Sequence, residues 1–242
     1  MAIRVAVAGA AGRMGQTVCA AVEGAGDLEL TGRADPILNT QVTDVLGHAD
    51  VLVDFTVPTS AVANAREAVQ AGVHVVIGTT GFDPAELSDL ADAKANVFIA
   101  PNFAIGAVLM MRFAIEAAKH MRAAEIIELH HDGKVDAPSG TAINTAERIA
   151  AASSDWSPDP TTEVAIAGAR GAKGAGGIPI HSVRLRGLVA HQEVLLGKDG
   201  QSLSIRHDSY DRSSFMPGVL IAVKRVADHP GVTLGLEALL NL

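Results

Sequence analysis

The chain has 242 residues, 48% of them apolar and 19% charged, which is the composition of a globular protein and excludes a disordered one. The formal net charge is −8 and only 3% of the residues are aromatic, so neither nucleic acids nor acidic membrane surfaces are expected partners. A single cysteine, Cys19, can form neither an internal disulfide nor a thiolate zinc site. Because the first residues lack a signal-peptide pattern and no apolar stretch suits a membrane span, we expect a cytoplasmic protein.

The first part of the chain alternates short apolar runs with helical patterns. Helical spacing of apolar residues follows the first run, and further helical patterns are predicted between the later ones. Strands that alternate with helices in this way predict βαβ units and a mostly parallel sheet. The predicted strands cover 3–8, 28–31, 51–55, 73–77 and 97–100, and the later helices cover 60–71 and 84–95.

After residue 102 the pattern changes to β-rich sequence with short connections, which predicts a smaller α+β domain with a mixed or antiparallel sheet. A final helix over 215–227 is expected to return to the first domain. We therefore predict one domain from 1–104 and 214–242 and a second from 105–213. The elements expected in this part are a helix from 105, strands at 125–129, 182–186, 189–196 and 202–207, a helix at 141–152, and structureless segments at 153–160 and 168–177.

Three glycines, Gly9, Gly12 and Gly15, lie between the first predicted strand and the first helix. Glycines at this place let the backbone approach a pyrophosphate at a helix N-terminus, although the spacing differs from Gly-x-Gly-x-x-Gly and also fits an ordinary turn. Asp35 follows the second strand, about 20 residues after Gly15, where a carboxylate accepts hydrogen bonds from ribose hydroxyls. Two more loops, 78–81 and 100–103, follow strands of the same sheet, so we predict a dinucleotide site.

The segment from His130 to Thr141 carries two adjacent histidines, Lys134, and a Ser-Gly-Thr sequence that opens a helix. A histidine pair alone is more often solvated surface, but a lysine and a helix N-terminus beside it predict a proton donor in an anion-binding cleft. Adjacent residues of a strand point to opposite faces, so His130 and His131 are not expected to share a metal ion. Ser139 lacks the setting of a hydrolase nucleophile.

These residues resemble the dihydrodipicolinate reductase family, and the resemblance covers the whole chain. The matching motifs are 7–15, 54–56, 76–82, 100–103 and the segment 130–141. The resemblance implies a Rossmann-like domain for NADH or NADPH and a second domain that binds a small cyclic dicarboxylate and forms a homotetramer. It implies reduction of 4-hydroxy-tetrahydrodipicolinate, with loss of water, in lysine and diaminopimelate biosynthesis.

By matched position, the family's catalytic acid/base and proton donor correspond to His130 and Lys134. The residues that bind the substrate carboxylates correspond to His131, Gly140 and Thr141. The cofactor-binding residues correspond to Gly9, Ala10, Ala11, Gly12, Arg13, Met14, Asp35, Gly78, Thr79, Thr80, Ala100, Pro101, Asn102 and Phe103.

The choice of nicotinamide depends on Asp35, whose charge repels the 2′-phosphate of NADPH. Pro36 follows it where some members of the family have arginine, so we expect NADH to be favoured, with Arg13 or Arg33 able to offset the repulsion.

Two alternative functions stay open. The first is another two-domain NAD(P)-dependent amino-acid dehydrogenase. The second is a non-catalytic nucleotide sensor, which predicts a damaged histidine–lysine segment.

Overall fold

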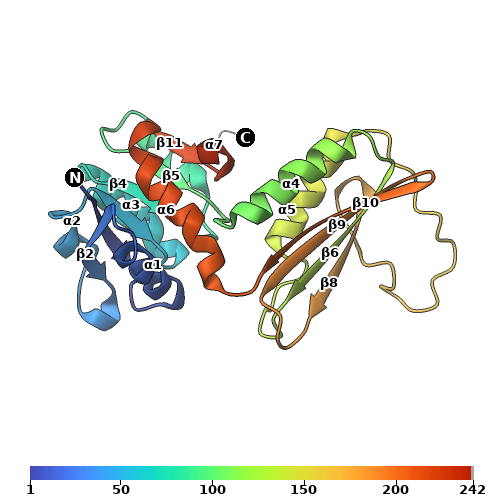
Figure 1. Cartoon of the computed structure of the whole chain (residues 1–242), viewed down its shortest axis with the longest axis horizontal. Helices are drawn as coiled ribbons and strands as arrows, with labels where there is room; N and C mark the ends of the chain where they lie inside the picture. Colours follow the sequence, from blue (N-terminus) through green and yellow to red (C-terminus); the bar gives the residue numbers. More distant parts are fainter. Residues whose placement is uncertain (241–242) are drawn as a thin grey trace. The chain divides into compact units, whose positions relative to one another are not determined.

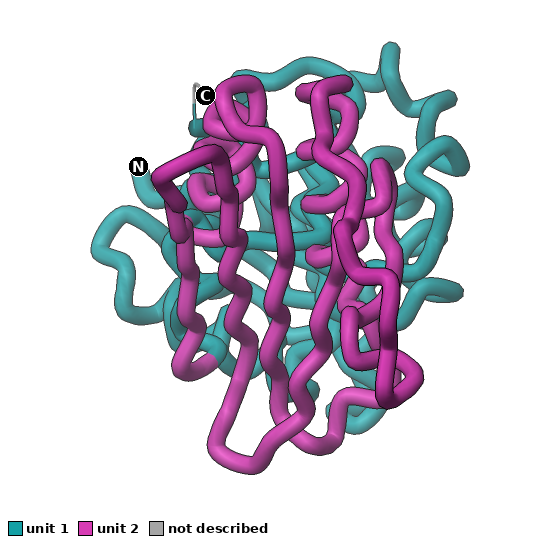
Figure 2. The backbone as a smooth tube through the Cα atoms, turned by 90° about the vertical axis from the view of Figure 1, so that its right-hand side faces the viewer, with its two compact units in different colours: residues 1–105, 212–242 teal, residues 106–211 magenta. Residues whose placement is uncertain are grey.

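A computed structural model describes residues 1–240 of the chain. These residues form two compact units, which we call unit 1 (residues 1–105 and the segment that starts at Arg212) and unit 2 (Gly106–Asp211). Figure 2 shows the two units in different colours. Within residues 1–240, no helix has both the length and the apolar character that crossing a membrane requires.

Unit 1 contains a six-stranded parallel sheet with the order β11-β5-β4-β3-β1-β2. The strand order reverses between β1 and β3, and open α/β sheets bind ligands beside such a reversal, outside the carboxyl ends of the strands. The central strands are buried on both faces, as parallel strands between two helical layers must be. The strands are β1 (Ile3–Ala8), β2 (Leu28–Ala34), β3 (Val51–Asp54), β4 (His74–Ile77), β5 (Val97–Ile99) and β11 (Val232–Leu234).

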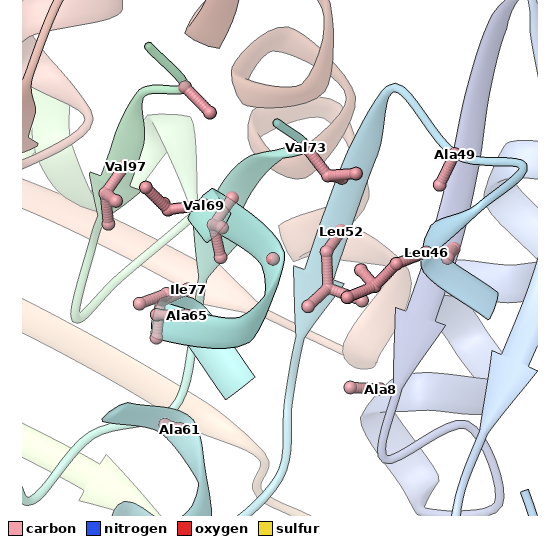
Figure 3. Close-up of a cluster of buried hydrophobic side chains, with 14 of the residues drawn as sticks. Ala8, Leu46, Ala49, Leu52, Ala61, Ala65, Val69, Val73, Ile77 and Val97 are labelled. Carbon is pink, nitrogen blue, oxygen red and sulfur yellow. The ribbon is translucent and has the colours of Figure 1, made fainter. Parts of the chain in front are cut away.

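Helices cover both faces of this sheet (Figure 1). On one face, small residues of α3 such as Ala61 and Ala65 pack against Leu52 and Ile77, which lets the helix lie close to the strands (Figure 3). The buried valines of α1 and α6 belong to the other layer. The helices of unit 1 are α1 (Arg13–Glu23), α2 (Val42–Leu46), α3 (Pro58–Gln70), α6 (Met216–Arg225) and α7 (Glu237–Leu240), with 3-10 turns at Pro36–Leu38, Pro84–Leu90, Arg212–Phe215 and Val226–Asp228.

Unit 2 contains a five-stranded mixed sheet with the order β10-β9-β6-β8-β7. Strands β6 and β8 are parallel, and the other neighbours are antiparallel. Helices α4 and α5 lie on one face, where Ile126, Val194 and Leu196 form the centre of a second core (Figure 1). The elements are α4 (Ile105–Ala118), β6 (Ala123–His130), α5 (Gly140–Ala152), β7 (Ala172–Lys173), β8 (Pro179–Arg184), β9 (Ala190–Lys198), β10 (Gln201–Ser209) and a 3-10 turn at Ala175–Gly177.

The structure confirms the predicted Rossmann-like sheet and the second mixed sheet, and it corrects several local expectations. The helix predicted over 84–95 is a 3-10 turn at Pro84–Leu90, in which only Leu87 is buried. Because a single buried position cannot hold a long amphipathic helix against the sheet, the rest of this segment forms turns. The segment 168–177 is not structureless, because β7 and a 3-10 turn lie within it. Helix α2 and strand β11 are too short for periodicity to reveal.

Candidate active site

The glycine loop after β1 packs closely against the end of β3 and against the first turn of α1. Gly9 has a φ of +76°, and a Cβ atom there would lie 2.4 Å from the carbonyl oxygen of Phe55 at the end of β3. A Cβ atom on Gly15 would lie 2.0 Å from the carbonyl oxygen of Gly9. Both positions therefore require glycine. Gly12 is the N-cap of α1 and no side chain caps this helix, so the loop leaves a helix N-terminus available to an anion.

Asp35 lies at the end of β2 and is only 9% exposed. Its Oδ2 accepts a hydrogen bond from the Ala11 N–H at 3.0 Å, and its Oδ1 accepts one from the Ile37 N–H at 2.9 Å. The carboxylate thus joins the glycine loop to the end of β2. A cavity of about 440 Å³ lies beside it, lined in part by Gly9, Gly12 and Asp35.

Asp54 is a fully buried carboxylate at the end of β3. Its Oδ1 accepts hydrogen bonds from the hydroxyls of Thr56 at 2.8 Å and Thr79 at 2.7 Å, and its Oδ2 accepts one from the Asn64 amide at 2.7 Å. This group fixes the loop that contains Thr79, while Thr80 stays exposed. Sequence reasoning did not assign Asp54 a function, although a carboxylate that ends an apolar strand was a usable signal.

Two more predicted loops lie at the same edge of the sheet. Gly78 passes close to the ring of Phe55, since a Cβ atom there would lie 2.1 Å from it. The loop after β5 begins with a hydrogen bond from the Ala100 N–H to the Ile77 carbonyl at 3.1 Å. Phe103 is buried, with its ring centroid 5.9 Å from that of Phe55, so its ring belongs to the core. The predicted cofactor residues thus follow β1, β2, β4 and β5.

The two arginines expected near Asp35 differ in their surroundings. Arg33 pairs with Glu23 of α1 at 2.6 Å and lies beside Cys19, whose thiol has a pKa raised by burial. This ion pair holds the side chain of Arg33, a residue of β2, against α1. The expectation that Arg33 offsets the charge of Asp35 therefore loses its support. Arg13 is exposed in the first turn of α1, directly after the glycine loop.

His130 ends β6 in unit 2, with a side chain that is 16% exposed. Its Nδ1 lies 2.5 Å from Oε2 of Glu128. Burial lowers the pKa of His130 below the ordinary histidine value, although Glu128 opposes this shift. Lys134 follows in the next turn, and its Nζ donates to both carboxylate oxygens of Asp136 at 2.7 and 2.8 Å. This ammonium group lowers the pKa of Asp136.

Helix α5 begins directly after this segment. Ser139 caps it, with its Oγ accepting a hydrogen bond from the Ala142 N–H at 3.2 Å. A Cβ atom added to Gly140 would meet nothing within 4 Å, so the first turn faces open space. Thr141 is held through its carbonyl, which accepts from the Thr145 hydroxyl at 2.7 Å, and His131 is exposed. A cationic side chain and an open helix N-terminus suit an anionic ligand.

Sequence reasoning also missed the ion pair beneath this segment. Glu128 is fully buried and receives both terminal nitrogens of Arg184. A charged residue two positions after Ile126, on the apolar face of the strand, was a signal for Glu128, but Arg184 lies 56 positions away in the chain. In the part of the chain that the structure describes, no cluster of three or more histidine, cysteine or carboxylate side chains could hold a metal ion.

Comparisons with known proteins agree with these features. Residues 3–103 match the family model of the dihydrodipicolinate reductase N-terminus, and residues 106–240 match that of its C-terminus. Proteins named 4-hydroxy-tetrahydrodipicolinate reductase from Beutenbergia cavernae and Corynebacterium diphtheriae are each 51% identical over the full length of both chains. The structure of dipicolinate-bound dihydrodipicolinate reductase from Paenisporosarcina sp. TG-14 matches with a TM-score of 0.86 and 40% identity, covering 98% of this chain and 99% of that one. The chain belongs to the dihydrodipicolinate reductase family.

Proposed function

We propose that the chain catalyses the reduction of 4-hydroxy-tetrahydrodipicolinate to tetrahydrodipicolinate, with loss of water, in lysine and diaminopimelate biosynthesis. The observation that carries this function is the full-length family match together with an intact segment from His130 to Thr141. A non-catalytic sensor has no need of Lys134 and an open helix N-terminus beside His130. Family membership also decides against an amino-acid dehydrogenase of similar build.

NADH or NADPH is the cofactor of this family, and unit 1 fits such a dinucleotide. Because Gly9 and Gly15 have no side chains, the backbone of the glycine loop lies directly before α1, next to the cavity beside Asp35. When bound, the reduced nicotinamide supplies the hydride. The residues that we propose to hold the dinucleotide are Gly9, Ala10, Ala11, Gly12, Arg13, Met14, Asp35, Gly78, Thr79, Thr80, Ala100, Pro101, Asn102 and Phe103, the last through its backbone.

The substrate is a small cyclic dicarboxylate, and we place it in unit 2. His131, Gly140 and Thr141 bind its carboxylates, because the first turn of α5 offers free N–H groups and the positive end of the helix dipole. The open space at Gly140 supports this placement. The Paenisporosarcina structure contains dipicolinate, which is a planar ring with two carboxylates.

His130 and Lys134 carry out the proton transfers of the proposed reaction. Loss of water from the substrate leaves a conjugated imine that accepts hydride at C4, and the electron-rich ring then takes up a proton. Lys134 supplies that proton from Nζ and stabilises the negative charge that develops in the ring. The lowered pKa of His130 leaves its imidazole neutral at neutral pH, so it acts as the acid/base partner.

We also propose a homotetramer built through the sheet of unit 2. Helices α4 and α5 cover one face of this sheet, and Leu195 of β9 is an exposed apolar residue whose strand neighbours Val194 and Leu196 point into the core. A second chain could cover this outer face. Light scattering on the intact protein should then give a mass of about four chains. A monomer at micromolar concentration would contradict this assembly.

The proposed function is tested by a coupled assay. Freshly generated 4-hydroxy-tetrahydrodipicolinate is mixed with the enzyme and with NADH or NADPH, and the absorbance of the reduced nicotinamide is followed. We expect oxidation that depends on both substrate and enzyme. Oxidation with amino or keto acids and none with the cyclic substrate would overturn the proposal.

A further inference from the structure

Glu128 is a charged side chain on the side of β6 that faces the hydrophobic core of unit 2. It is 0% exposed on the face of β6 that carries Ile126, and burying a carboxylate is costly unless partners satisfy it. Arg184, on the neighbouring parallel strand β8, provides two of these partners. Its Nη1 donates to Oε2 at 2.9 Å and its Nη2 donates to Oε1 at 2.8 Å. This fork geometry holds the carboxylate in one orientation.

Glu128 also forms hydrogen bonds with the proposed active site. Oε2 lies 2.5 Å from Nδ1 of His130, and Oε1 accepts from the N–H of Ser139 at 3.3 Å. Arg184 also donates to the carbonyl oxygen of Asp136 at 2.6 Å. The buried pair therefore holds the segment between β6 and α5 at three points, which are its histidine, its middle and its helix cap.

We propose that Glu128, oriented by Arg184, is a positioning residue that fixes the tautomer and the direction of His130. An ionised carboxylate can only accept hydrogen bonds, so the proton of the neutral imidazole lies on Nδ1. Nε2 is then the nitrogen that exchanges a proton with the substrate. The same carboxylate aligns the first turn of α5 with that nitrogen through Ser139. This inference rests on the proposed reductase function and names a residue that acts through His130.

The charges around His130 determine what happens when Glu128 is neutralised. Burial opposes the ionisation of Glu128, but hydrogen bonds from Arg184, Ser182 and His130 outweigh it and lower the pKa of this carboxyl. Burial, and after it the charges of Lys134 and Arg184, lower the pKa of His130, whereas Glu128 raises it. Loss of the Glu128 charge should therefore move the titration of His130 to lower pH.

A purely structural role is the alternative, in which the pair only joins β6 to β8. The same strand offers a matched control. Glu125 accepts from Arg170 Nη2 at 2.6 Å and lies 2.8 Å from Nε2 of His181, but it is on the other face of the sheet. Glu125→Gln thus removes a carboxylate with the same kinds of partners from the same strand, away from His130. Because Glu125 pairs with Leu195 on the face proposed for assembly, light scattering checks that this variant keeps the mass of the wild type.

The test compares Glu128→Gln with Glu125→Gln in the full-length enzyme. Steady-state kinetics measure kcat and KM, and NMR follows the titration of His130 without substrate, assigned by the signal that His130→Asn removes. We expect Glu128→Gln to lower kcat by about 100-fold, the range of general acid–base catalysis, and to shift the His130 titration to lower pH. Glu125→Gln should keep both close to wild type, and both variants should bind NADH normally.

An unchanged kcat and an unchanged His130 titration in Glu128→Gln would overturn the proposal. Equal losses of kcat in the two variants, with His130 titrating as in wild type, would overturn it as well. If Glu128→Gln does not fold, Glu128→Asp decides by the same two measurements, because it keeps the charge but withdraws the carboxylate from His130. A wild-type enzyme that is inactive on the cyclic substrate would refute the proposed function, whereas the titration tests the positioning role by itself.

Discussion

The two candidate sites are built from different materials. In unit 1 the site is mainly backbone, since Gly9 and Gly15 leave no room for a Cβ atom and the carboxylates of Asp35 and Asp54 hold loops in place. In unit 2 it is made of charged side chains around a buried ion pair. Substitutions of the loop glycines in unit 1 should therefore act through shape and weaken dinucleotide binding, whereas substitutions of the charged side chains in unit 2 should act through charge and slow the chemistry.

The largest effect is expected when the proposed proton donor is removed. Lys134→Ala should lower kcat by about 100-fold to 10,000-fold, the range of general acid–base catalysis, and raise the KM of the substrate. His130→Ala should mainly lower kcat. Binding of NADH, measured by calorimetry, should not change in either variant. Lys198→Ala, which removes an exposed lysine at the end of β9, serves as the control. A near-normal kcat in both Lys134→Ala and His130→Ala would show that this segment does not carry out the reaction.

At Gly15 in unit 1 we expect the substitution to weaken the binding of NADH. A methyl group there would lie 2.0 Å from the carbonyl oxygen of Gly9, so Gly15→Ala must displace the loop. The strain should destabilise the fold by about 1–3 kcal/mol and weaken NADH binding by about 10-fold or more. Gly24→Ala, at the other end of α1, adds a Cβ atom in ordinary contact at 3.4 Å and should bind NADH normally. Equal NADH affinity of the two variants would contradict the steric account.

A substitution at Gly140 sharpens the comparison, because there a new side chain enters open space. Gly140→Val should weaken binding of pyridine-2,6-dicarboxylate by about 10-fold, corresponding to about 1.4 kcal/mol, with little change in stability or NADH affinity. Gly47→Val adds the same side chain where a Cβ atom also meets nothing within 4 Å. Calorimetry that finds normal binding of this analogue to Gly140→Val would refute the placement of the substrate carboxylate.

The smallest effect concerns the choice of cofactor. We expect a higher kcat/KM with NADH than with NADPH, because Asp35 repels a 2′-phosphate and Arg33 is paired with Glu23. Asp35→Ala should reduce the ratio of kcat/KM with NADH to kcat/KM with NADPH by about fivefold, since two charges about 4 Å apart in water interact by roughly 1 kcal/mol. The ratio is measured because the variant also loses hydrogen bonds to the N–H groups of Ala11 and Ile37, which weakens both cofactors alike. A wild-type preference for NADPH would show that Arg13 outweighs Asp35.

The sequence predicts those parts of the molecule that depend on short-range patterns. A strand, a glycine loop and a helix follow one another along the chain, and so do His130, Lys134 and the start of α5. Partners far apart in the sequence were not predictable, because strand pairing brings them together. Arg184 reaches Glu128 only when β8 lies beside β6, and Thr79 reaches Asp54 only when β4 lies beside β3. Arg33 shows the same limit, since the packing of α1 on β2 supplies its partner Glu23.

Transfer of deuterium from NADH that carries deuterium at both hydrogen positions of the nicotinamide C4 tests the central claim most directly. The wild-type enzyme is mixed with the labelled cofactor and freshly generated 4-hydroxy-tetrahydrodipicolinate, and the product is analysed by mass spectrometry. The proposed reduction predicts that the cyclic dicarboxylate product carries the label from the cofactor, and that Lys134→Ala forms it far more slowly. Oxidation of the cofactor without label in the product, or no oxidation at all, would contradict the account.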